Sequence, residues 1–183
     1  MGAPGDLAHY RGDSMATVTT SIPVDEQAAI VEAIDAICHH EPQLTPRSKQ
    51  ALVLAIHRGD LAIAKDDKDA LIGWLIAESI CPGVQELGMA YIMPEWRQTG
   101  VRNLLLEALI DDSQDNMAIT YNSRIARDLV AAYNFEISTL RVLCTRSRGR
   151  ILIKRLSSLR SVYAVLRHAS QQQPIYLIRK MRK

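Results

Sequence analysis

The residues best suited to bind a ligand gather in one stretch, where Arg97 and Arg102 flank a short turn that contains Gly100. The turn follows a strand-like segment, residues 86–93, and precedes a segment with helical apolar spacing, residues 101–110. The first turn of a helix offers unpaired backbone N–H groups at the positive end of the helix dipole, and this arrangement binds phosphate. The pattern therefore predicts a phosphate or pyrophosphate ligand at the start of this helix.

The same stretch resembles the acyl-CoA signature of the GNAT superfamily of N-acetyltransferases. That signature reads Val-x-Pro-x-x-Arg-x-x-Gly-x-Gly/Ala and continues into a Leu-rich helix. Four residues fall in place, namely Ile92, Pro94, Arg97 and Gly100. The final small residue of the signature is replaced by Arg102, whose side chain either crowds the ligand, binds a phosphate or points to solvent.

A second part of the resemblance lies downstream. The family often carries Ala-x-x-Leu-Tyr-x-x-x-Gly-Phe on a later helix, and the segment from Ala126 to Phe135 has the same spacing. Val130 stands at the position of the family's Tyr, and Asn134 replaces its Gly. The two parts together cover roughly residues 60–145.

The resemblance implies an α/β protein with a mixed α+β sheet, in the GNAT-like acyl-CoA N-acyltransferase fold. It also implies acetyl transfer from acetyl-CoA directly to a primary amine, with the backbone N–H of Ile92 polarising the thioester and residues 97–102 binding pyrophosphate. Asn122 or Ser123 would contact the pantetheine arm. The residues implied to bind the cosubstrate are Tyr91, Ile92, Met93, Arg97, Gln98, Thr99, Gly100, Val101, Arg102, Asn103, Asn122 and Ser123.

Two proton transfers must accompany such a reaction, because the amine loses a proton and the leaving thiolate gains one. Glu86 is the only acid within the strand before the turn, so it is the first candidate base; the alternative is an ordinary exposed Glu at a strand end. Glu95, in the turn, is the second candidate. Val130 cannot donate a proton. Tyr133, one helical turn further on, is therefore the candidate acid, and core packing is the alternative for it.

Length and composition predict one domain, residues 25–183, preceded by a loose leader, residues 1–24, with one short strand at residues 16–22. The chain has 48% apolar and 23% charged residues, and no apolar run approaches the ~20 residues that cross a bilayer. No secretory signal opens it. Three separated cysteines indicate neither a disulfide framework nor a metal site, and they favour a cytoplasmic protein without membrane partners.

Periodicity and turn residues predict the remaining elements. The helices expected before the sheet span residues 25–40 and a second segment from Thr45-Pro46 to Gly59. The strands expected are residues 61–65, 70–79, 85–93, 117–121, 138–145 and 175–178. An extra basic C-terminal helix, which departs from the family, is expected from the apolar stripe Leu152, Leu156, Leu159, Tyr163 and Leu166.

Charge is distributed unevenly along the chain. Residues 141–183 carry 12 of the 22 Lys and Arg residues and none of the 20 Asp and Glu residues. This basic end either neutralises the acidic body or grips an anion, with Arg155, Arg160 and Arg167 at the edges of the helix. The second hypothesis for function follows from it: a catalytically impaired GNAT-like scaffold that binds nucleic acid weakly, or binds a protein. A homodimer is compatible with both hypotheses.

Overall fold

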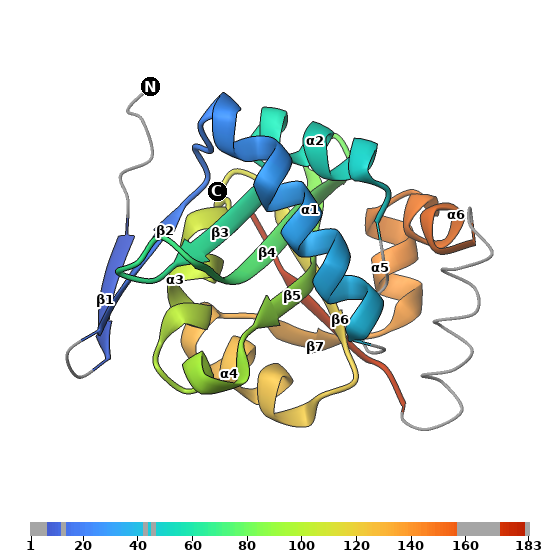
Figure 1. Ribbon diagram of the computed structural model, residues 1–183. Coiled ribbons are helices and arrows are strands. Elements are labelled where there is room, and N and C mark those ends of the chain that lie inside the picture. Colours follow the sequence, from blue (N-terminus) through green and yellow to red (C-terminus); the bar gives the residue numbers. More distant parts are fainter. Residues whose placement is uncertain (1–6, 12–13, 42–43, 45–46, 157–172, 182–183) are drawn as a thin grey trace. The chain divides into compact units, whose positions relative to one another are not determined.

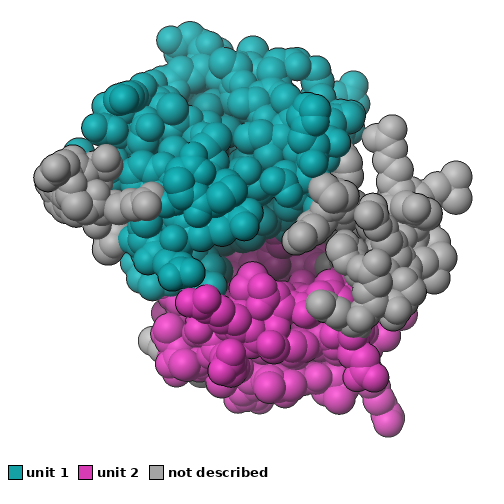
Figure 2. Space-filling model, turned by 60° about the horizontal axis from the view of Figure 1, so that its bottom comes forward, with its two compact units in different colours: residues 1–77, 89–110 teal, residues 78–88, 111–183 magenta. Residues whose placement is uncertain are grey.

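The computed structural model describes residues 7–11, 14–41, 44, 47–156 and 173–181 (Figure 1). The chain forms two compact units, which Figure 2 shows in different colours. Unit 1 comprises Met1–Ala77 and Met89–Ile110, and unit 2 comprises Glu78–Gly88 and Asp111–Lys183. Two strands, β4 (Leu71–Cys81) and β5 (Val84–Ile92), contribute residues to both units.

The strands of unit 1 pair antiparallel in the order β1 (Leu7–Arg11), β2 (Ser14–Thr19), β3 (Leu61–Lys65) and β4. β2 confirms the strand expected in the leader, with earlier bounds, whereas β1 was not predicted. The polar turn between β3 and β4 is closed by Asp66, whose backbone N–H donates to Ala70 O at 3.0 Å. Register runs from Leu61↔Ile76 to Lys65↔Leu71 across this hairpin.

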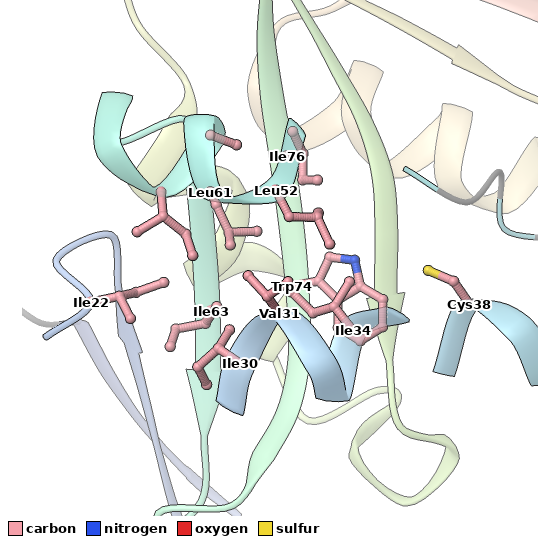
Figure 3. Packing of buried hydrophobic residues seen from close by; sticks show 12 residues of the cluster. Ile22, Ile30, Val31, Ile34, Cys38, Leu52, Leu61, Ile63, Trp74 and Ile76 are labelled. Atoms are coloured by element: carbon pink, nitrogen blue, oxygen red, sulfur yellow. The ribbon is translucent and has the colours of Figure 1, made fainter. Parts of the chain in front are cut away.

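Two helices, α1 (Val24–His40) and α2 (Lys49–Arg58), cover one face of β3 and β4. Figure 3 shows the shared core, in which Ile34 and Leu52 from the helices pack around Trp74. α2 begins at its N-cap Ser48, and it ends as predicted at Gly59, which adopts the left-handed conformation that caps helices. Thr45 and Pro46, the expected start of α2, lie outside the described residues.

The opposite face of the same strands carries α3 (Val101–Leu109), which contacts β1, β2 and β3. Side chains alternate along β3, so that Leu61 and Ile63 enter the core under α1 and α2 while Ala62 and Ala64 point the other way. Those alanines leave room for the buried face of α3, which comprises Val101, Leu105, Leu106 and Leu109. α3 is thus fixed by its apolar side, and a turn of eight residues, 93–100, connects it to the end of β5.

Unit 2 contains the parallel step of the sheet. β5 pairs with β6 (Asp115–Thr120) from Val84↔Asp115 to Leu87↔Ala118. β8 (Ile175–Arg179) lies antiparallel between β6 and β7 (Glu136–Ser138), and α4 (Ser123–Tyr133) joins β6 to β7. The described strands form a mixed sheet of order β1-β2-β3-β4-β5-β6-β8-β7, which confirms the predicted α/β fold class.

The segment after β7 corrects one prediction. Residues 138–145 were expected to form a strand, but Leu140–Arg146 form helix α5, followed by α6 (Arg150–Leu156). Thr139 caps α5 because its Oγ1 accepts from Val142 N–H at 3.3 Å, and Leu143 enters a core with Ile151, Met117 and Ile178. α6 lies at the start of the segment in which the extra basic helix was expected; Leu159, Tyr163 and Leu166 lie outside the described residues. Every helix within the described ranges is too short or too polar to span a bilayer.

Candidate functional site

The turn predicted to hold phosphate lies wholly in unit 1, between β5 and α3. It begins with a short 3-10 helix, Pro94–Trp96, whose buried Trp96 anchors it. Two residues then adopt left-handed backbone, Gln98 with φ 74° and Gly100 with φ 91°. Thr99 between them is tied down, because its Oγ1 donates to Trp96 O at 2.7 Å. Left-handed residues in a turn are typical of backbone nests, in which successive N–H groups bind an anion.

The N–H groups of this turn are available for a ligand. Among the described residues, the backbone N–H groups of Gln98, Thr99, Gly100 and Val101 donate to no protein group. The first intrahelical bonds start only beyond them, with Asn103 N–H donating to Gly100 O at 2.8 Å. Gly100 is the N-cap of α3 and has no side chain to cap it. An anion at this position would satisfy the free donors and meet the positive end of the α3 dipole.

The last residues of β5 expose a backbone edge beside this turn. Met93 N–H donates to Ile72 O of β4 at 2.9 Å. Gly73 lies so close to β5 that a Cβ there would be 2.8 Å from Tyr91 O. Since successive peptide groups of a strand alternate in direction, the N–H and C=O of Ile92 both point away from β4. This is the orientation that a backbone donor to a ligand requires.

β5 changes conformation on its way to this edge. Met89 has φ 50°, which is uncommon for a residue other than glycine and costs of the order of 1 kcal/mol or more. Its half-buried side chain packs on the core of unit 1. The pairing of β5 with β6 ends two residues earlier, at Leu87↔Ala118. β5 thus stops pairing with β6 before it reaches Ile92. The sequence did not predict the left-handed backbone at residue 89, because Met rather than Gly occupies that position.

Arg97 connects the turn to the strand. Its Nε donates to Ile92 O at 3.1 Å, while its side chain is exposed. Its own backbone N–H donates to Pro94 O at 3.2 Å, which closes the 3-10 helix. Arg102 is half-buried in the first turn of α3, and Asn103 is exposed beside it. The predicted residues Tyr91 to Met93 and Arg97 to Asn103 therefore form one continuous site segment.

The side chain of Tyr91 packs against the hydrophobic core of unit 1. Its ring stacks on Trp74 with centroids 4.8 Å apart and an interplanar angle of 28°. Burial raises the pKa of the Tyr91 phenol, Glu41 adds to this increase, Arg97 opposes it and Glu95 adds slightly. The phenol therefore stays protonated at neutral pH and can donate a hydrogen bond.

Glu86, the first candidate base, lies in the part of β5 that belongs to unit 2. It is only 5% exposed, so the alternative of an exposed Glu at a strand end is wrong. Glu86 follows Val84 by two residues, on the same face of β5, and pairs in register with Met117 of β6; Val84 and Met117 both belong to the core of unit 2. The catalytic role of Glu86 stays a prediction.

The remaining predicted residues lie on or before α4, also in unit 2. Asn122 caps the helix, because its Oδ1 accepts from the backbone N–H groups of Arg124 at 2.9 Å and Ile125 at 3.4 Å. Sequence reasoning missed this cap, although Asn before a helical pattern is its usual signal. Ser123 is exposed at the first position of α4. Tyr133 is half-buried near the helix end, and Val130 is 37% exposed. The roles assigned to these residues stay predictions.

The cysteine and histidine residues near the end of α1 do not form a metal centre. Burial and the nearby Asp35 raise the pKa of the Cys38 thiol to about 11, so the thiol stays protonated. His39 Nδ1 lies 2.8 Å from Asp35 O one turn back along the helix. Within the part of the chain that the structure describes, no three His, Cys, Asp or Glu side chains are grouped to hold an ion.

Comparisons with known proteins come from structure. Neither the known protein families nor the curated proteins give a match to this sequence. Among solved structures, the N-acetylglutamate synthase of Neisseria gonorrhoeae, complexed with coenzyme A and N-acetyl-glutamate, is similar with a TM-score of 0.57 and 14% identity. The alignment covers 92% of this chain but only 35% of that one, so this chain spans about a third of the synthase.

Two further neighbours match over most of their length. A GNAT-family acetyltransferase from Bacillus cereus has a TM-score of 0.56 and 18% identity, over 92% of this chain and 99% of its own. A GNAT superfamily phosphinothricin acetyltransferase from Sinorhizobium meliloti, in complex with AcCoA, has a TM-score of 0.52 and 20% identity, over 68% and 76%. The chain has the GNAT acetyltransferase fold. At these identities the GNAT likeness is one of fold, and the chemistry must be argued from the site.

Proposed function

We propose that this protein is an acyl-CoA-dependent N-acyltransferase that transfers acetyl from acetyl-CoA directly to a primary amine. One observation carries the proposal: at the start of α3, the backbone N–H groups of Gln98, Thr99, Gly100 and Val101 have no acceptor among the described residues. In a GNAT fold this turn directly follows the strand edge at Ile92. Pyrophosphate fits there because it accepts several hydrogen bonds at once and carries the charge that the helix dipole favours.

The residues of unit 1 supply binding and polarisation. The turn N–H groups hold the pyrophosphate, and Arg97 adds positive charge beside it. The outward N–H of Ile92 donates to the thioester carbonyl oxygen, whose negative charge grows as the amine attacks. A fixed backbone donor needs no reorganisation during the reaction, and this is the main source of rate enhancement that we assign to the site.

Proton transfer and contacts to the arm of the cosubstrate are assigned to further residues of the chain. Glu86 takes the proton of the amine, directly or through water. Ser123 and the amide nitrogen of Asn122 contact the pantetheine arm, since the amide oxygen of Asn122 already caps α4. Tyr133 is the candidate donor to the leaving thiolate, with water as the alternative.

The test targets Gly100. Gly100→Glu places a negative side chain and backbone strain where the pyrophosphate is bound, so acetyl-CoA affinity measured by calorimetry should fall by about 100-fold or more, equivalent to about 2.7 kcal/mol. Gly59→Glu is the matched control, because Gly59 is also left-handed, with φ 71°, caps a helix of the same unit and has open space around it.

The two variants separate strain from site chemistry. Gly59→Glu should lose a similar amount of thermal stability and still bind acetyl-CoA like the unmodified protein. Equal affinity of a folded Gly100→Glu variant would show that this turn does not bind the coenzyme.

A further inference from the structure

The side chain of Arg97 reaches back from the turn to the strand edge. Its Nε donates to Ile92 O at 3.1 Å, and the geometry at Met93 and Gly73 directs that carbonyl away from β4. Ile92 thus presents its N–H and its C=O on the same side of β5, and Arg97 Nε donates a hydrogen bond to this C=O. A carbonyl held in this way keeps the neighbouring N–H in one orientation.

We infer that Arg97 is a positioning residue, which fixes the Ile92 backbone through Nε so that the Ile92 N–H meets the thioester carbonyl. This inference rests on the proposed function. It assigns to Arg97 a task beyond its charge: binding the pyrophosphate needs a cation near the turn, whereas aligning the strand edge needs a donor at the Nε position. A planar guanidinium can serve both, because Nε bonds Ile92 O and the two terminal nitrogens carry further N–H donors.

Replacing Arg97 by lysine separates the two tasks, which are binding the pyrophosphate and holding the Ile92 carbonyl. Arg97→Lys keeps the positive charge, but it has no Nε–H and presents a single ammonium with no fixed fork. If the ammonium stays at the pyrophosphate, the Ile92 carbonyl loses its partner. If it moves to Ile92, the pyrophosphate loses its charge partner. A single lysine therefore cannot satisfy both tasks at once.

A measurement on bound acetyl-CoA tests this without any acceptor amine. The carbonyl stretch of acetyl-CoA labelled with ¹³C at its acetyl carbonyl, recorded by isotope-edited infrared spectroscopy, moves to lower wavenumber when a backbone N–H donates to it. Calorimetry on the same samples gives affinity. We expect the unmodified protein to show the shifted band, and Arg97→Lys to lose most of the shift while its affinity stays within about threefold, below 1 kcal/mol.

Arg97→Gln, which lacks the charge, should lose both the band shift and affinity. Arg58→Lys is the matched control for the exchange itself, because Arg58 is exposed in the last turn of α2, and it should change neither reading. Thermal unfolding of each variant confirms that it is folded. An unchanged band together with unchanged affinity in Arg97→Lys would overturn the positioning role and leave the proposed function standing. Absence of acetyl-CoA binding in the unmodified protein would instead overturn the proposed function, and this inference with it.

Discussion

Gln98 gives the turn its shape through a left-handed backbone conformation that lowers the stability of the protein. Its φ of 74° is left-handed, a conformation that costs an L-residue with a side chain about 1–2 kcal/mol. Gln98→Gly should relieve that strain. Part of the gain is offset by the greater freedom of glycine in the unfolded chain. We expect a net increase of about 1 kcal/mol in the free energy of unfolding, measured by urea denaturation.

A second glycine substitution, which should lower the free energy of unfolding, provides the comparison. Gln50 is exposed within α2, where Gln→Gly should reduce stability by about 0.5–1 kcal/mol. If both changes destabilise the protein equally, the left-handed turn at Gln98 is not formed in solution.

At the residue scale, the sequence alone predicted where α3 begins, because the helix starts at Val101, directly after Gly100 of the predicted turn. The spacing of Arg97 and Gly100 indicated a ligand-binding helix start, and the left-handed Gly100 and free N–H groups agree with it. The burial of side chains could not be predicted in this way. Glu86 follows the polar residue Gln85, yet it is buried where β5 pairs with β6. Burial of a strand residue depends on partners distant in sequence, which no local pattern records.

At the scale of elements, α5 is where local reasoning failed. The segment Ser138–Thr145 contains β-branched residues, which favour strands. The structure gives a helix, because Thr139 supplies an N-cap, and Leu140, Leu143 and Ser147 recur at helical spacing. The cap signal was present in the sequence, and only the packing of Leu143 in the core of unit 2 decides between the two interpretations.

The cap yields a prediction for this element. Thr139→Ala removes the acceptor for Val142 N–H and should reduce the free energy of unfolding by about 1 kcal/mol. Thr145→Ala, in the same helix, should be neutral or slightly stabilising, because Thr145 lies inside α5 and its hydroxyl bonds only Arg141 O. Chemical denaturation monitored by circular dichroism compares the two. A larger loss from Thr145→Ala than from Thr139→Ala would contradict the assignment of the helix start.

At the scale of the whole molecule, the uneven charge now has a partial explanation. Three basic residues of the C-terminal region pair with acids of the same unit: Arg146 with Asp115 at 3.4 Å, Lys180 with Glu136 at 2.8 Å, and Arg179 with Asp112. These pairs favour the interpretation that the basic end neutralises the acidic body, over a dedicated anion-binding surface. Arg160 and Arg167, named as the edge of such a surface, lie outside the described residues.

The remaining positive charge still attracts polyanions. Among the described residues, the exposed Arg141, Arg148 and Arg150 have no acidic partner within ion-pair distance. We expect RNA binding no tighter than the ~10⁻⁴–10⁻⁶ M typical of non-specific contacts, with affinity that falls steeply as salt rises because counterions are released. Fluorescence anisotropy with a labelled single-stranded RNA should show weaker binding, and a shallower salt slope, when all three are changed to Gln.

The control for net charge changes three other exposed cations to Gln, namely Arg58, Lys68 and Arg127, and it should weaken binding less. Because a bare electrostatic attraction does not distinguish sequences, tight binding that persists at high salt and selects one RNA over another would make the nucleic-acid-binding scaffold the better account of this protein.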